Sequence, residues 1–153
     1  MRHAKFIAVA IPASAILLGG IVPGRAQAAQ PAEDRRTLIT LDEYARATVL
    51  AEMRAMLSSL QEIIDGLARG DMCAVVSAAR ASGMQVAADV APKVQAQLPE
   101  AFKKLGFSMH TDFDALAATA ESAPDAGRTL AQLGSTLQKC VACHAAYQIR
   151  VGR

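Results

Sequence analysis

The stretch QKCVACHAAYQIRVGR, residues 138–153, places Cys140, Cys143 and His144 within five consecutive positions. Such a cluster can bind structural zinc, act as a redox-active dithiol or attach haem covalently. Structural zinc needs four ligands, usually from two such pairs, and this chain has one pair. A thioredoxin-like dithiol requires a βαβ unit, whereas the flanking residues favour helix. The C-x-x-C-H spacing therefore favours covalent haem.

Helical geometry gives a physical reason for this spacing. On a helix, Cys140 and Cys143 lie one turn apart on one face, so both sulfurs can form thioether bonds to the same porphyrin. His144 follows directly and is placed to bind the iron as its proximal ligand. We expect one covalently bound haem c.

The first 28 residues have the features of a secretory signal peptide. Residues 2–5 are positively charged, an apolar run continues to Val22, and residues 26–28 form an A-x-A cleavage site. The alternative, an uncleaved anchor, is disfavoured because proline and glycine interrupt the run. We expect export to the periplasm, a mature chain beginning at Ala29, and no membrane span after the signal is removed.

Charge and cysteine content exclude two classes of function. The chain has 16 Lys+Arg and 14 Asp+Glu, and the leader holds Arg2, Lys5 and Arg25, so the mature part carries 13 − 14 = −1. We find no basic stripe interleaved with aromatic residues, which argues against nucleic-acid binding. Three cysteines do not make a disulfide scaffold. The remaining one, Cys73, is expected to be a buried thiol.

The mature part is rich in helix-forming residues, and its caps and breaks divide it into helices. Residues 29–39 are predicted to be a polar lead-in, and residues 40–150 the folded domain. The expected helices cover residues 40–68 after a capping box at Thr40–Glu43, 71–90, a short piece at 100–105, a third from Ser108 or Thr111, and 125–149. Short first and last links predict an all-α fold, an antiparallel four-helix bundle.

A helical bundle with C-x-x-C-H near the end of its last helix, and with Tyr147 three residues after the histidine, resembles the class II c-type cytochromes. These include the cytochromes c′ and their low-spin relatives. The resemblance covers about residues 36–150. It implies a monohaem protein that carries electrons between periplasmic or membrane-bound redox proteins, is not an enzyme and can form homodimers. Gln148, where the family often has Arg or Lys, and residues 68–85 suggest a divergent branch.

The second axial ligand of the iron separates two functions. Methionine gives a closed iron suited to electron transfer, whereas an apolar residue leaves the iron open to small gases such as nitric oxide. The last helix runs towards the haem end, so the first helix begins there, and Met53 on its apolar stripe is the favoured ligand, with Met56 second. If Leu50 faces the iron instead, Arg46 would contact a haem propionate and the iron would be five-coordinate. His110 is expected near the haem, where it could ligate iron, contact a propionate or cap a helix.

A haem enzyme that uses peroxide is disfavoured. That chemistry needs a positioned acid–base pair beside the iron. Only His110 could offer a base, and the sequence shows no arginine beside it.

Overall fold

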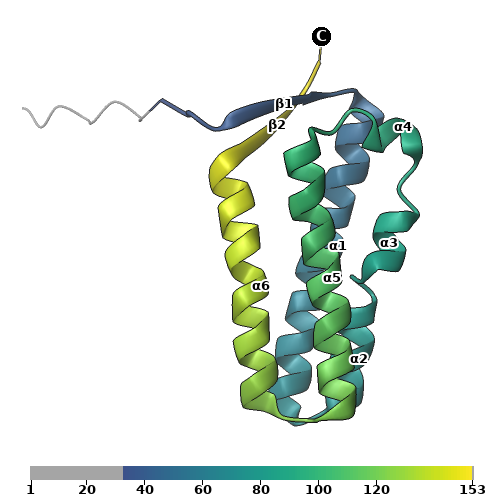
Figure 1. Ribbon diagram of the computed structural model, residues 1–153, viewed down its shortest axis with the longest axis vertical. Helices are drawn as coiled ribbons and strands as arrows, with labels where there is room; N and C mark the ends of the chain where they lie inside the picture. The colour runs from purple at the N-terminus through teal and green to yellow at the C-terminus, as the bar shows by residue number, and fades with distance from the viewer. Residues whose placement is uncertain (1–32, 153) are drawn as a thin grey trace, which may run out of the picture. The chain divides into compact units, whose positions relative to one another are not determined.

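The computed structural model describes residues 33–152, and the predicted signal peptide lies outside this range. The elements of this part are β1 (Thr37–Leu41), α1 (Glu43–Arg69), α2 (Met72–Arg80), α3 (Met84–Ala88), α4 (Pro92–Gln95), α5 (Glu100–Ser122), α6 (Ala126–Ala146) and β2 (Tyr147–Val151). Helices α1, α2, α5 and α6 lie lengthwise beside one another (Figure 1). The predicted, mostly helical architecture is confirmed, whereas the two strands were not predicted.

Local capping sets the bounds of α1. The Asp42 side chain accepts a hydrogen bond from the Ala45 N–H at 2.7 Å, which satisfies a free donor of the first turn. The predicted capping box at Thr40 is therefore wrong, because Thr40 belongs to β1. At the other end Gly70 adopts the left-handed conformation with φ of 69°, which suits glycine best, and the helix stops there.

The starts of α2 and α6 agree with the helix starts predicted near residues 71 and 125, and an aspartate caps each of them. Asp71 accepts from the Ala74 N–H at 3.0 Å, and Asp125 accepts from the Arg128 N–H at 2.6 Å. The end of α6 differs from its prediction. The helix stops at Ala146 rather than near residue 149, because the following residues leave it to pair with β1.

Two predicted helices have different bounds in the structure. The second one breaks at residues 81–83 into α2 and α3. The short piece at 100–105 and the third helix form one continuous helix, α5, which begins at Glu100. Ser108 and Thr111 do not cap it, since both lie inside α5 and donate their hydroxyls to the carbonyls of Leu105 and Phe107.

Strands β1 and β2 form a parallel pair in the register Thr37↔Tyr147 to Leu41↔Val151. Ile39 and Leu41 are almost fully buried, at 2% and 1% exposed. The predicted lead-in at 29–39 is therefore not polar throughout, and the folded domain begins before residue 40. The pair ties the start of α1 to the end of α6.

The apolar core of residues 33–152 consists of two clusters. The larger cluster lies around Phe113, where α1, α2, α5 and α6 meet. The second lies near the strands and contains Ile39, Leu41, Val49, Phe102 and Cys143. The cavity described below lies where these two clusters adjoin.

Gly66 marks the closest approach of α1 to α2. A Cβ at this position would lie 2.9 Å from Val75 Cγ2 and 3.2 Å from the Asp71 carbonyl oxygen. We expect Gly66→Ala to lower the free energy of unfolding by about 1–3 kcal/mol, because an added methyl forces two packed helices apart.

A matched variant controls for the intrinsic preference of alanine for helix. Gly134 is exposed within α6, and a Cβ there would meet nothing within 4 Å. Gly134→Ala should raise the free energy of unfolding by about 0.5–1 kcal/mol. Urea unfolding followed by circular dichroism measures both, and equal effects of the two variants would contradict the close approach at Gly66.

Candidate functional site

A cavity of about 430 Å³ lies between α1, α5 and α6, and the segment containing α3 and α4 adds to its wall. This volume falls within the range of about 300–1,000 Å³ common for cofactor and ligand sites. The wall is mostly apolar. One face of α1 supplies Val49, Leu50, Met53, Met56, Leu57 and Leu60. The facing part of α5 supplies Phe102, Lys103, Gly106, Phe107, Met109 and His110.

The three motif residues complete the wall from α6. Cys140, Cys143 and His144 all line the cavity. Cys143 is buried, Cys140 is partly buried and both thiols are free, while His144 is exposed. Burial raises the pKa of both thiols, so both are protonated at neutral pH. Within residues 33–152, no group of three or more His, Cys, Asp or Glu side chains is arranged to hold a metal ion.

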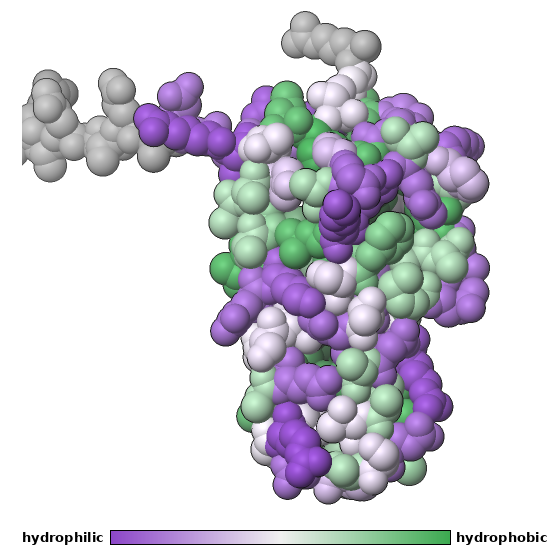
Figure 2. Space-filling view, viewed as in Figure 1, coloured by the Kyte–Doolittle hydropathy of each residue, from purple (hydrophilic) through white to green (hydrophobic). Residues whose placement is uncertain are grey.

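Several apolar side chains of the cavity wall are open to solvent. Leu57 is 65% exposed and Phe107 is 37% exposed, although both lie on the apolar faces of their helices. On the face shown in Figure 2, hydrophobic side chains reach the surface among charged ones, mostly in the half nearest the strands. A large apolar group in this cavity would bury part of this surface, which favours binding through the hydrophobic effect.

Contacts between α5 and α6 place His144 along the helices. Lys139 Nζ lies 2.6 Å from Asp112 Oδ2, and the rings of Tyr147 and Phe102 meet edge to face with centroids 5.4 Å apart. The two helices run antiparallel between these contacts (Figure 1). His144 therefore lies level with the second turn of α5, near residue 105.

A buried chain of hydrogen bonds links α1 to α5 farther along the helix axes from the strands than His144. Ser82 donates its hydroxyl to Ser59 Oγ at 2.8 Å, and His110 Nδ1 lies 2.8 Å from the Ser82 carbonyl oxygen. Since α1 and α5 run in the same direction, Ser59 lies approximately level with His110. The second turn of α5 lies about five residues before His110. The residues of α1 that lie five or six positions before Ser59, at 53 and 54, are therefore at the same height as this turn.

These two relations bring Met53 of α1 and His144 of α6, which both line the cavity, to about the same height. At 1.5 Å per residue, Met53 lies within about 2 Å of the level of His144. Met56 lies about 3 Å below that level and Leu50 about 6 Å above it. Of the apolar cavity-lining side chains of α1, Met53 is thus the closest in height to the motif histidine.

The other predicted site residues are placed differently. His110 is 4% exposed and lines the cavity, about 8 Å below the level of His144 along the helix axis. Arg46 is half-buried on α1, and it is not part of the cavity wall. Cys73 lies on α2 and is exposed, so the expectation of a buried thiol was wrong.

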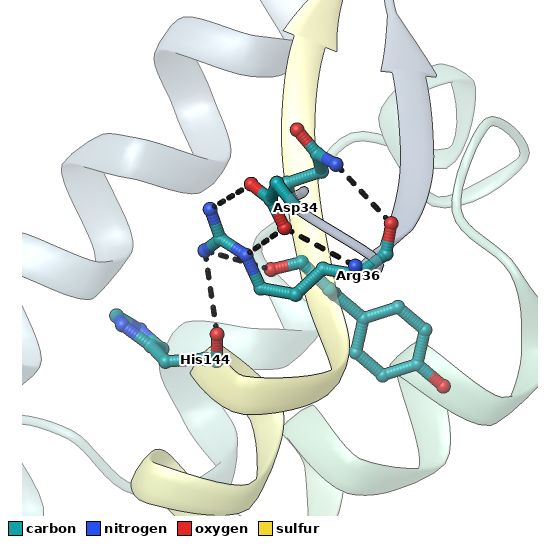
Figure 3. A network of polar contacts seen from close by, with 5 residues as sticks. Asp34, Arg36 and His144 are labelled. Atoms are coloured by element: carbon teal, nitrogen blue, oxygen red, sulfur yellow. Dashed lines mark hydrogen bonds and ion pairs between the residues drawn. The ribbon is translucent and has the colours of Figure 1, made fainter. Parts of the chain in front are cut away.

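Arg36 holds the backbone around His144, and the sequence analysis missed this role. Its Nη1 donates to the carbonyl oxygens of His144 and Tyr147 at 3.3 and 3.4 Å, and it pairs with Asp34 at 2.7 Å. Gln148 Nε2 in turn donates to the Arg36 carbonyl oxygen. In Figure 3 the His144 ring points away from Arg36. The network thus fixes the main chain and leaves the imidazole free.

The Asp34–Arg36 pair gives a prediction about pH. Hydrogen bonds from Arg36 lower the pKa of Asp34 to about 2, so its carboxylate stabilises the network above the usual value of 3.8, and this contribution is lost as the pH falls towards 2. In Arg36→Gln we expect Asp34 to titrate near 3.8 instead. Carboxyl carbon NMR measures both values. Arg35→Gln is the control and should leave Asp34 unchanged; normal titration of Asp34 in the unsubstituted protein would contradict the pair.

Comparison with known proteins finds no matching family model, no matching curated protein and no matching solved structure. Within the described range, no helix combines the length and the apolar character needed to cross a membrane. The interpretation of the cavity therefore depends on the chemistry and placement of its own residues.

Proposed function

We propose that this chain is an exported c-type cytochrome of the class II kind, a four-helix bundle that carries electrons in the periplasm. One observation supports this proposal most. A mostly apolar cavity of about 430 Å³ has both cysteines and the histidine of a C-x-x-C-H motif in its wall, together with Met53 of α1 at about the height of His144. When bound there, a single haem c supplies a one-electron redox centre.

The residues present fit such a group. Cys140 and Cys143 are free thiols on one helix face, which suits them to hold the porphyrin through two thioether bonds. His144 is an exposed imidazole beside them, free to bind iron. Gly106 lies near the level of Cys143, and a Cβ there would meet nothing within 4 Å, so this part of the wall leaves open space.

Met53 completes the proposed site. A methionine sulfur as second ligand closes the iron to external molecules and raises its reduction potential, as electron transfer requires. The neighbouring apolar side chains of α1 and α5 would pack against the haem and make its surroundings more apolar. We expect the partners to be periplasmic or membrane-bound redox proteins, and the role to be electron transfer rather than catalysis.

The five-coordinate, gas-binding alternative has less support. It needs an apolar residue such as Leu50 opposite the iron and Arg46 beside a propionate. Leu50 does line the cavity, but about 6 Å from the level of His144. Arg46, which would have to contact the propionate, does not line the cavity.

Production of the full chain in a bacterium that attaches haem c tests the proposed function. We expect haem to remain bound to the protein after acid–acetone extraction. The optical spectrum of the reduced protein should be that of six-coordinate iron and should not change with carbon monoxide. Extraction of all the haem would contradict covalent attachment, and rapid uptake of carbon monoxide would support the gas-binding alternative.

A further inference from the structure

His110 is a buried histidine in the cavity wall that the proposed electron transfer does not require. It is 4% exposed, and its Nδ1 lies 2.8 Å from the Ser82 carbonyl oxygen. Because a carbonyl oxygen only accepts, Nδ1 carries the proton and donates it. Ser82 in turn donates to Ser59 Oγ, so the polar groups around the ring hold its orientation. The tautomer of His110 is thereby set.

The second ring nitrogen, Nε2, is left with its lone pair free. Within residues 33–152 Nε2 has no hydrogen-bond partner, and that part of the chain contains no fully buried side-chain N or O atom without one. Nε2 is therefore reached from the cavity that His110 lines. Its offset of about 8 Å from the level of His144 places it beside the proposed haem rather than at the iron.

We propose that His110 binds a proton at Nε2 when the iron is reduced and releases it when the iron is oxidised. This inference rests on the proposed haem site. On reduction of the proposed haem by a one-electron donor, Nε2 would form one N–H bond with a proton taken from hydronium, whose O–H bond breaks to leave water. No other bond breaks, and the net charge of the site is unchanged.

The coupling follows from electrostatics in an apolar wall. Reduction makes the iron site more negative by one unit charge, and in surroundings of low dielectric constant this favours a positive charge nearby. The Nδ1–H bond to Ser82 persists in both states, so the ring needs no reorientation to accept the proton. Proton affinity at Nε2 is thus higher in the reduced protein, and the reduction potential falls as the pH rises.

Other charged groups surround His110, and one of them could give the same behaviour. The ionisable groups that share the cavity wall with His110 are Glu52 and Arg54 on α1, Lys103 on α5, and Cys140, Cys143 and His144 on α6. Asp112 and Asp114 lie within four residues of His110 on α5, and Lys139 of α6 reaches Asp112. Lys139 is paired with Asp112, and Asp114 accepts from the Met84 N–H at 2.9 Å. Glu52 is the carboxyl group in the cavity wall, and burial raises its pKa. It is therefore the competitor that a test must separate from His110.

Potentials of the haem-loaded protein, measured by spectroelectrochemistry from about pH 5 to pH 8, test the inference. We expect the potential to fall by up to 59 mV per pH unit, which corresponds to one proton per electron. In His110→Asn the side-chain amide can still donate to Ser82, since it lies near the position of Nδ1, but it does not titrate in this range. This variant should have a flat potential, whereas Glu52→Gln should keep the original slope.

The outcomes separate this inference from the proposed function. Absence of haem would overturn both. A haem-loaded protein with a flat potential, or an unchanged slope in His110→Asn, would overturn the role of His110 alone. If His110→Asn does not fold, nitrogen NMR of the His110 ring in the unsubstituted protein decides, because the inference requires Nε2 to be more protonated after reduction at the same pH.

Discussion

A Cys140→Ala/Cys143→Ala double variant is expected to lose all its haem on acid–acetone extraction, whereas the unsubstituted protein keeps it. Thioether bonds survive this treatment, and iron–imidazole bonds do not. The two sulfurs lie one turn apart on α6, and both line the cavity, so they can reach the same porphyrin. Alanine suits both positions because it leaves no buried hydroxyl in the wall.

Cys73→Ala is the matched control for this experiment. Cys73 is also a free thiol, but it is exposed on α2 and is not part of the cavity wall. This variant should therefore carry as much extraction-resistant haem as the unsubstituted protein. Retention of haem by the double variant, or its loss in Cys73→Ala, would contradict attachment through the motif.

Met53→Ala is expected to open the iron to carbon monoxide. The proposed ligand sulfur is removed, and no other apolar cavity-lining residue of α1 is as close to the level of His144. The reduced variant should show a high-spin spectrum that changes on addition of carbon monoxide. Its reduction potential should fall, because a methionine ligand raises the potential of haem iron.

Met56→Ala and Leu50→Ala are the controls, since they remove neighbouring side chains from the same wall. Both should stay closed to the gas. If Met56→Ala opens the iron and Met53→Ala does not, Met56 is the ligand. If the unsubstituted protein already binds carbon monoxide, the iron is five-coordinate and the proposed electron carrier becomes a gas-binding protein.

Much of the helical structure could be predicted because its signals are local. Asp71 and Asp125 cap the helices that follow them, and Gly70 ends α1, as short-range rules predict. These features depend on few residues at a time.

Other features could not be predicted because distant residues determine them. Ile39 and Leu41 form a strand only because β2 pairs with them, and Arg36 acts through the carbonyl of His144, 108 positions away. Nothing in the sequence separates Arg36 from Arg35. The break after α2 follows from contacts of Ser82 with two other helices, which a pattern within one helix does not contain.

The apolar stripe of α1 was predicted only in part. Leu57, Leu60 and Ile64 follow one another at steps of three and four residues, a spacing that predicts one inward face, yet Leu57 and Ile64 are 65% and 51% exposed and Leu60 is 9% exposed. Leu57 is part of the cavity wall, whereas Ile64 is not. Hydrophobic periodicity indicates which face avoids water, but it does not distinguish contact with other helices from contact with a cofactor.

The pairing of β1 with β2 also has a consequence for the order of folding. It joins residues separated by almost the whole domain, so its loop-closure entropy is large and local helices can form long before it. Arg36 reaches its acceptor at His144 only when this closure is made. We therefore expect the turn that carries Cys140 and Cys143 to be among the last parts to become enclosed, so that under the proposed function both thiols would stay accessible to an enzyme that attaches haem.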